Sequence, residues 1–363
     1  MNCWKRNLGC MSLVCVLLLA LAACGEAASE SGAASGDSAG LEGTTLNLYT
    51  WADMFPQEVL DAFEETYGVT IHYSNFDYDE DMLAKLEETD GGEYDLVIAD
   101  DYILEMVNSE GLAQALDKSR ISNYDNINPS YLGLFYDPDD AYDIPYGAGI
   151  PLIVYNPDLV DIEITGYADL WDASLKDNVA IIGNYRVVDG IALKEMGESF
   201  NTEDLDTIAE AGDLLMDLAP NIRAINDTNT SDLLLSGEVA VAFMYTSEVN
   251  KALQADDNLV AVYPEEGLGF GTMAQFIPSN APNADAAYAF IDYILEPEVS
   301  AACYEYIGYY CTNQAAEEYI SEEMQEYIVV PATASDGEAI ENISNEAEDA
   351  HAEVWTKFQS ACD

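Results

Sequence analysis

The sequence predicts an α/β protein of two lobes, each built on a mainly parallel sheet flanked by helices. Two observations lead to this fold class. Short apolar segments alternate with amphipathic helical segments along both halves of the 363-residue chain, and 49% hydrophobic residues are enough to fill two separate cores. No segment repeats at a fixed period, which sets aside solenoids and propellers.

The first half of the chain alternates strand and helix three times. Pro56 favours the start of the first helix and Gly68 favours its end, because proline suits a first helical turn and glycine suits the residue after the last one. The predicted strands cover 46–51, 69–73 and 95–99, and the two later helices include 82–86 and 102–107. Strands that are joined by helices run parallel, so we expect a parallel sheet with helices on both faces.

The second half repeats the alternation and predicts the second lobe. Its strands are expected at 150–155, 179–182, 239–244, 259–262 and 272–277, and its helices at 188–196, 205–218, 285–295, 299–307 and 338–358. We assign residues 45–148 and 273–317 to lobe 1, and residues 149–272 and 318–363 to lobe 2. The segments 146–150 and 270–272 cross between the lobes and are the expected hinge.

The amino terminus has the pattern of a lipoprotein signal peptide. Lys5 and Arg6 precede an apolar run over 11–22, and small residues stand immediately before Cys24. The run is too short to span a bilayer as a mature helix, and no other segment is long and apolar enough to do so. We therefore expect residues 1–23 to be a signal peptide and Cys24 to be the site of lipid attachment.

A Gly-, Ala- and Ser-rich stretch follows the predicted lipid anchor. Residues 24–44 show no apolar period and are expected to form the anchor and a flexible tether. The predicted location is outside the cytoplasm, either anchored by lipid at the outer face of the cytoplasmic membrane or in the periplasm.

The charge of the chain excludes nucleic acid as a partner. Its 69 acidic residues against 11 basic ones give a formal net charge of -58, which repels phosphate backbones. Such a surface keeps a protein soluble, and it also raises the local concentration of cationic solutes near a cleft.

Three cysteines lie in the region expected to fold outside the cytoplasm. Cys303, Cys311 and Cys362 cannot all pair with one another. Either one disulfide forms, or all three remain buried thiols that pack as small apolar side chains. The sequence leaves both alternatives open.

The sequence predicts neither a metal site nor a cofactor. The only histidines, His72 and His351, are not at ligand spacing from the cysteines. The alternating acids between Asp77 and Asp81, with Glu88, resemble a calcium loop, but Met82 occupies the position where the sharp turn needs glycine.

Enzymatic signatures are weak. The spacing Gly36–Gly40 fits a nucleophile elbow, but it falls in the tether rather than between a strand and a helix. Asp100 and Asp101 are a pair of acids that a secreted hydrolase would use, and this remains the alternative from another functional class. We expect a binding protein and no enzyme.

Aromatic and acidic residues gather where predicted strands end, which is where α/β proteins bind ligands. Aromatic faces attract cations and carboxylates pair with them, so this combination suits an amine. These residues are Trp51 and Asp53 after the first strand, Asp100 and Tyr102 after the third, Tyr245 and Glu248 after 239–244, and Tyr309 after a helix.

The order of short motifs between 46 and 327 resembles the spermidine/putrescine-binding proteins of ABC importers. The motifs are Leu48-Tyr49-Thr50-Trp51, Ala84-Lys85-Leu86, Tyr94-Asp95-Leu96-Val97, Leu116-Asp117-Lys118-Ser119, Ile144-Pro145-Tyr146, Ala168-Asp169-Leu170-Trp171, Gly237-Glu238-Val239 and Ile307-Gly308-Tyr309. The resemblance implies the two-lobed type II periplasmic-binding-protein fold, a polyamine such as putrescine or spermidine as ligand, and an ABC transporter permease as partner. We expect a monomer.

The same resemblance assigns candidate ligand-binding residues. The family's pocket aromatics correspond to Trp51, Tyr102, Tyr245 and Tyr309, and Asp53 stands where family members can offer a carboxylate. Glu248 and Asp100 are acids of this chain's own, and Asp100 replaces a family serine.

Other positions depart from the family. Asn184 and Val187 stand where the family has an Asp and a Glu near the arginine that corresponds to Arg186, Met273 replaces another aspartate, and Gly271 replaces a pocket tryptophan. Asn184 is still predicted to contact the ligand. A buried ammonium needs a counter-charge, and several family carboxylates are absent here. A small solute other than a polyamine therefore remains an alternative ligand.

Overall fold

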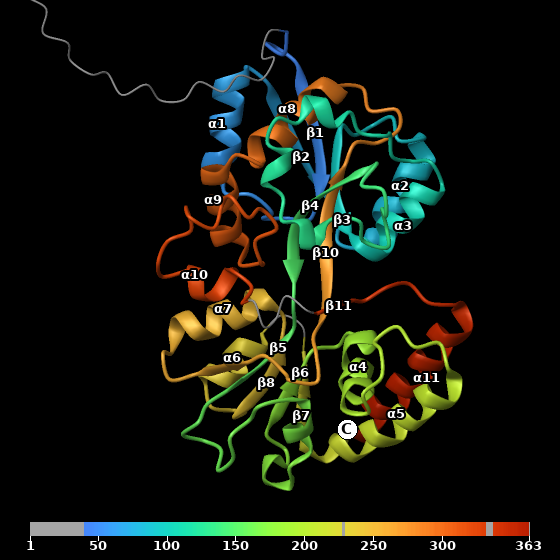
Figure 1. Ribbon diagram of the computed structural model, residues 1–363, viewed down its shortest axis with the longest axis vertical. Helices are drawn as coiled ribbons and strands as arrows, with labels where there is room; N and C mark the ends of the chain where they lie inside the picture. The colour runs from blue at the N-terminus through green and yellow to red at the C-terminus, as the bar shows by residue number, and fades with distance from the viewer. Residues whose placement is uncertain (1–39, 227–228, 332–336, 363) are drawn as a thin grey trace, which may run out of the picture. The chain divides into compact units, whose positions relative to one another are not determined.

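The residues described by the structure, a computed structural model, are 40–226, 229–331 and 337–362 (Figure 1). The predicted signal peptide, the lipid site Cys24 and most of the tether lie outside them. None of the helices formed by these three stretches has the length and apolarity needed to cross a membrane.

The first sheet contains the three strands predicted at the start of the chain. Its strands are β1 Thr45–Thr50, β2 Thr70–Asn75, β3 Leu96–Asp100, β4 Asp143–Gly149, β10 Gly269–Phe276 and β11 Glu338–Ala339. The order is β11-β10-β3-β1-β2, and β4 pairs with β10. As predicted, β1 runs parallel to β2 and β3, but β10 is antiparallel to both β3 and β4, so the sheet is mixed.

Helices cover both faces of the first sheet. They are α1 Gln57–Tyr67, α2 Asp79–Thr89, α3 Asp101–Ser109, α8 Ala284–Ile294 and α9 Pro297–Ile307. Figure 1 shows α1, α8 and α9 on one side of the strands and α2 and α3 on the other. Gly68 ends α1 in the left-handed conformation at φ 67°, as its position after the helix predicted.

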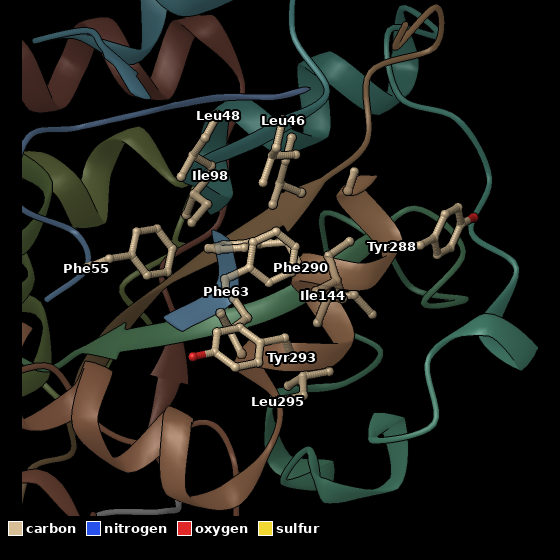
Figure 2. Packing of buried hydrophobic residues seen from close by; sticks show 14 of the residues in the cluster. Leu46, Leu48, Phe55, Phe63, Ile98, Ile144, Tyr288, Phe290, Tyr293 and Leu295 are labelled. Atoms are coloured by element: carbon tan, nitrogen blue, oxygen red, sulfur yellow. The ribbon is translucent and has the colours of Figure 1, made fainter. Parts of the chain in front are cut away.

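Side chains along β1 alternate between two hydrophobic cores, because successive residues of a strand point to opposite faces. Leu46 and Leu48 are fully buried with Phe63 and Phe290, whose rings meet edge to face at 4.9 Å (Figure 2). Tyr49 packs on the opposite face, with the apolar residues of α2 and α3. This double burial explains why the predicted strands are so apolar.

The second sheet has the order β7-β6-β8-β5-β9. Its strands are β5 Leu152–Tyr155, β6 Val179–Ile181, β7 Ile222–Ile225, β8 Val241–Met244 and β9 Val260–Val262. β6 is parallel to β7 and β8, whereas β5 is antiparallel to β8 and β9. The chain enters this sheet along β5 directly from β4, without a helix between them. β5 runs in the opposite direction to its neighbours β8 and β9.

Helices also cover both faces of the second sheet. They are α4 Tyr185–Glu195, α5 Leu205–Leu218, α6 Thr230–Leu235, α7 Thr246–Ala255, α10 Gln325–Ile328 and α11 Asn345–Cys362. Figure 1 shows α4, α5 and α11 together on one side and α6 and α7 on the other. Short 3₁₀ helices occur at Lys118–Arg120, Tyr124–Asn126, Pro129–Tyr131, Tyr167–Trp171, Ala173–Leu175 and Ala219–Asn221.

Several parts of the chain differ from the sequence prediction: β7, α6, α7 and α10 have no counterpart in it, and β4 and the tail differ as follows. β4 was not expected as a strand; it contains Pro145 and two glycines and pairs with β10 around a register shift. The tail was expected to be helical from Glu338, but Glu338–Ala339 pair with β10 as β11, and α11 begins only at Asn345. In both places a partner strand overrides the local sequence preference.

Candidate functional site

Two adjoining cavities lie at the carboxyl ends of strands from both sheets. The first encloses about 550 Å³. It is lined by Glu80, Asp100, Asp101, Tyr102, Gly149, Pro151, Asn184, Tyr185, Arg186, Val187, Tyr245, Gly271, Met273, Tyr309, Ile340, Glu341, Asn342 and Glu348. The second encloses about 650 Å³ and shares Asp100, Met273 and Tyr309 with the first.

Every sequence-predicted ligand-binding residue except Glu248 lines one of these cavities or both. Asp100 and Tyr309 line both cavities. Tyr102, Asn184 and Tyr245 line the first cavity, and Trp51 and Asp53 line the second.

The start of α3 brings carboxylates to the first cavity. Asp100 precedes α3, but its side chain does not cap the helix. Asp101 accepts hydrogen bonds from the backbone N–H of Tyr102 at 2.9 Å and of Thr272 at 2.7 Å. The Tyr102 hydroxyl donates to Glu80 at 3.2 Å, which places a second acid beside the ring. Asp101 is therefore fixed to β10, while Asp100 is not engaged at the helix start.

Burial makes these acids weak. It raises the pKa of Asp101 to about 7, against which the two backbone hydrogen bonds act. It also raises the pKa of Asp79, directly behind the cavity, to about 6. The pKa of Asp100 is raised well above its ordinary value, first by burial and then by the charges of Asp79 and Asp101. A cation that entered the cavity would offset this repulsion and favour the ionised carboxylates.

Tyr309 sits where the chain passes between the two sheets. Its neighbour Tyr310 pairs with Ala148 through two backbone hydrogen bonds of 3.2 and 2.9 Å, and Asn250 on α7 donates to the Gly308 carbonyl at 2.6 Å. Gly149 on β4 leaves room for the Tyr309 ring, since a Cβ at position 149 would lie 3.2 Å from it. The backbone is therefore fixed on both sides of Tyr309, and its ring lies close to Gly149.

Trp51 and Asp53 lie on a loop that other tyrosines hold in place. The Tyr73 hydroxyl donates to the Trp51 carbonyl at 2.6 Å, and the Tyr146 hydroxyl donates to the Met54 carbonyl at 2.6 Å. Asp53 adopts a left-handed conformation at φ 59° and is exposed. The loop thus presents an aromatic ring and a solvated carboxylate to the second cavity.

The second-sheet side of the first cavity carries the only guanidinium among its lining residues. Arg186 donates to Glu348 on α11 at 3.1 Å, and the Tyr185 hydroxyl donates to the same carboxylate. Asn184 uses its side-chain oxygen to cap α4, accepting from the Val187 N–H at 3.3 Å. The positive charge on this wall is therefore already neutralised by an acid.

Glu248 has a different environment. Its carboxylate accepts hydrogen bonds from the Ser231 hydroxyl at 2.5 Å and the Ser231 N–H at 3.1 Å. It is absent from the lining of both cavities. These bonds join the start of α7 to the start of α6. Glu248 therefore stabilises the packing of these two helices.

Several lining residues were missed by sequence reasoning. Glu80 lies between Asp79 and Asp81, two of the alternating acids of the calcium-loop comparison, but it had no predicted role of its own. Tyr185, Glu341, Asn342 and Glu348 come from the start of α4 and from the tail, and no local pattern marks them. The four positions that depart from the family pattern, Asn184, Val187, Gly271 and Met273, all lie in this lining.

No group of three or more His, Cys, Asp or Glu side chains that could hold a metal ion occurs within 40–226, 229–331 and 337–362. Cys303 and Cys311 are both buried and outside any disulfide, and the Cys311 thiol contacts the Asn313 carbonyl at 2.9 Å. For these two residues the structure favours the buried-thiol alternative.

The chain is similar to known proteins over most of its length. Residues 58–332 match the family described as bacterial extracellular solute-binding protein. The chain is 34% identical over 281 residues to the spermidine/putrescine-binding periplasmic protein of Salmonella typhimurium, which covers 77% of this chain and 81% of that protein. It is 31% identical over 309 residues to a putrescine-binding periplasmic protein of Escherichia coli, and this match covers 78% of this chain and 82% of that protein.

A solved structure shows the same fold. The substrate-binding protein of a spermidine/putrescine ABC transporter from Streptococcus pneumoniae matches with a TM-score of 0.82 and 30% identity, covering 88% of this chain and 100% of that one. These likenesses confirm the predicted family resemblance and the type II periplasmic-binding-protein fold. They also favour a binding protein over a hydrolase. The chain therefore belongs to the bacterial extracellular solute-binding protein family.

Proposed function

We propose that the protein is the solute-binding component of an ABC importer and that it carries a polyamine such as putrescine or spermidine. Its relatives support this ligand class, because they are named as spermidine/putrescine-binding and putrescine-binding proteins.

The observation that carries the proposal is the charge of the first cavity. Five carboxylates line it, those of Glu80, Asp100, Asp101, Glu341 and Glu348. The one guanidinium in the lining pairs with Glu348 and cannot neutralise the rest. A cavity with such an excess of acids favours a cationic solute over a neutral or anionic one.

The aromatic rings suit the apolar part of a polyamine. Tyr102, Tyr245 and Tyr309 would contact its methylene chain and attract its ammonium groups through their faces. Asp100 is the proposed partner of one ammonium, and Asn184 offers a polar contact across the cavity. In spermidine the longer chain would extend toward Trp51 and Asp53 in the second cavity. Glu248 enters the proposal as a residue that stabilises α6 and α7 rather than as a ligand contact.

A differently shaped amine is the second candidate. Relative to what the family resemblance implies, Asn184, Val187 and Met273 remove three carboxylates from the lining, and Gly271 removes one large ring. The remaining acids lie mostly on the first-sheet side, which would suit a ligand with one ammonium group and an apolar remainder.

The proposal extends to the location and the moving parts. Residues 1–23 would be removed as a signal peptide, Cys24 would carry lipid outside the cytoplasm, and the protein would act as a monomer with its permease. The lobes would be 45–148 with 273–317 and 149–272 with 318–363. They would close over the ligand about the segments 146–150 and 270–272.

Thermal shift against a panel of solutes tests the ligand class. The panel contains putrescine, spermidine, monoamines, amino acids, sugars and thiamine-like cations. We expect putrescine or spermidine to raise Tm in a concentration-dependent way, because a ligand that binds only the native state stabilises it. A rise with a monoamine alone would select the second candidate, and a rise with sugars alone would contradict both.

A further inference from the structure

The segment Glu338–Glu348 of the tail forms a wall of the first cavity. Ile340, Glu341, Asn342 and Glu348 all line it. The family match ends at residue 332, before this segment. The segment therefore contributes to the cavity through residues to which the match gives no role.

The beginning of this segment is bound tightly to the second-sheet helices. The Glu338 carboxylate pairs with Lys194 on α4 at 2.6 Å and accepts from the Phe200 N–H at 3.2 Å. Asn201 donates to the Ala339 carbonyl at 2.8 Å and accepts from the Glu341 N–H at 2.8 Å. The backbone of this part is therefore fixed relative to α4.

Arg186 fixes the rest of the segment to α4. Its side chain is almost fully buried and donates to the Glu341 carbonyl at 3.2 Å and to the Glu348 carboxylate at 3.1 Å. The guanidinium thus joins the two ends of the stretch that contains Asn342. Asn342 lies between these two anchored positions and faces α3.

Asn342 makes contacts with the other side of the cavity. Its Nδ2 donates to the Tyr102 carbonyl at 2.9 Å and to the Glu105 carboxylate at 2.6 Å, both on α3. An amide nitrogen has two hydrogens, so both bonds form at once, and the bond to the carboxylate is charge-assisted. Asn342 therefore bridges the tail segment and α3 at the cavity edge.

The position of α3 matters because its first turn carries Asp101 and Tyr102, and Asp100 directly precedes it. If α3 separates from the tail segment, these groups move away from the wall formed by Glu341 and Glu348. A bridge that resists this separation would slow release of the ligand, because it has to break before the cavity opens.

We propose that Asn342 is a positioning residue that holds α3 against the tail segment 338–348 and so slows escape of the bound solute from the first cavity. The inference rests on the proposed function, because it assumes that an amine occupies this cavity. Asn342 contacts Glu105 on α3, and the contacts around Arg186 hold the tail segment that carries Asn342.

Stopped-flow fluorescence with putrescine tests the effect on release, because Trp51 lines the adjoining cavity and can report occupancy. The variants are Asn342→Ala, Asn342→Asp and the control Asn345→Ala, which removes the same amide from an exposed residue at the start of α11. We expect Asn342→Ala to raise koff at least about fivefold, because it removes two hydrogen bonds and the loss of one alone corresponds to about fivefold. Asn342→Asp should raise koff further, since it faces the Glu105 carboxylate.

A double-mutant cycle with Glu105→Gln identifies the bridge. If the contact carries the effect, Asn342→Asp should be less harmful in the Glu105→Gln background than in the wild type. Equal effects in both backgrounds, or a koff within twofold of the Asn345→Ala control for every variant, would overturn the proposal.

Hydrogen exchange of the ligand-free protein distinguishes failure of the Asn342 bridge from failure of the proposed polyamine binding. Asn342→Asp should increase exchange in peptides covering α3 and leave those covering α5 unchanged. If wild type binds no putrescine but α3 still loses protection, the polyamine assignment fails and the bridge stands. If putrescine binds and neither koff nor the exchange changes, the bridge fails.

Discussion

The backbone N–H of Asp100 donates a hydrogen bond of 3.2 Å to the carboxylate of Asp79. The contact brings two acidic residues together at the end of β3, behind the first cavity. Asp79 is buried, and no cation lines this side of the cavity. Packing of acids without a counter-charge opposes folding at neutral pH, and a cationic ligand would relieve it.

This arrangement predicts that affinity for putrescine rises with pH. Burial raises the pKa of Asp79 to about 6 and of Asp101 to about 7, so part of the cluster is protonated below neutrality. Binding of a dication favours the ionised acids and releases protons. We expect affinity to increase at least about tenfold between pH 5 and 8, since coupling to one proton gives up to tenfold for each pH unit below the pKa of the group. Calorimetry in buffers of different ionisation enthalpy would count the protons.

The ligand-free protein should show the opposite trend in stability. Because these pKa values are raised in the native state, that state binds more protons than the unfolded chain between the ordinary and raised values. Stability is therefore lost as pH rises from about 4 to 7. Asp79→Asn should flatten the profile of Tm against pH in this window. An unchanged profile in that variant would remove Asp79 from the account.

Replacing Glu248 should affect stability rather than binding. Glu248→Gln weakens the bonds from Ser231 that join α6 and α7, so the free energy of unfolding should fall by about 1 kcal/mol. The control Glu353→Gln alters an exposed ion pair on α11 and should change the free energy by less than about 0.5 kcal/mol. Urea unfolding measures both. A large loss of amine affinity in Glu248→Gln, at unchanged stability, would restore Glu248 as a ligand contact.

A methyl group at position 149 should displace the Tyr309 ring. In Gly149→Ala the new Cβ would lie 3.2 Å from Cε1 of that ring, which is tighter than ordinary van der Waals contact. We expect a loss of amine affinity of about fivefold, since overpacking costs about 1–3 kcal/mol and part of it is relieved by movement of the ring. In the Tyr309→Ala background the same substitution should have little effect. Additive losses would show that Gly149 acts independently of Tyr309.

Lipid attachment at Cys24 is tested by fractionation of cells that express the full chain. Cys24→Ser should move the protein from the membrane fraction to the soluble fraction, because it removes the site of lipid attachment and the apolar run before residue 24 is too short to span a bilayer. Cys15→Ser, a substitution within the predicted signal peptide, serves as the control. Retention of the Cys24→Ser protein on the membrane would contradict the anchor.

Sequence periodicity was sufficient for most of the elements. Leu205–Leu218 forms a helix with the predicted bounds, because its apolar face and the N-capping Asp204 both mark it. β4 was missed because Pro145, Gly147 and Gly149 disfavour a strand locally. Its conformation comes from pairing with β10, far away in the chain.

Most of the site was predictable from the sequence where its residues end or follow strands. Asp100, Tyr102 and Tyr245 directly follow strands, so topology alone brings them to a common edge. The contacts of Arg186 with Glu341 and Glu348 join residues separated by 155 and 162 positions. No local pattern encodes such a pairing. The amphipathic period of the tail marks a helix but not which of its acids reach the cavity.

Isothermal titration calorimetry with putrescine and spermidine tests the central claim most directly. The account predicts saturable binding of one amine per chain, and a loss of about tenfold or more in affinity for Asp100→Asn, which removes one proposed counter-charge. Absence of binding for both polyamines, or equal affinity in wild type and Asp100→Asn, would contradict it.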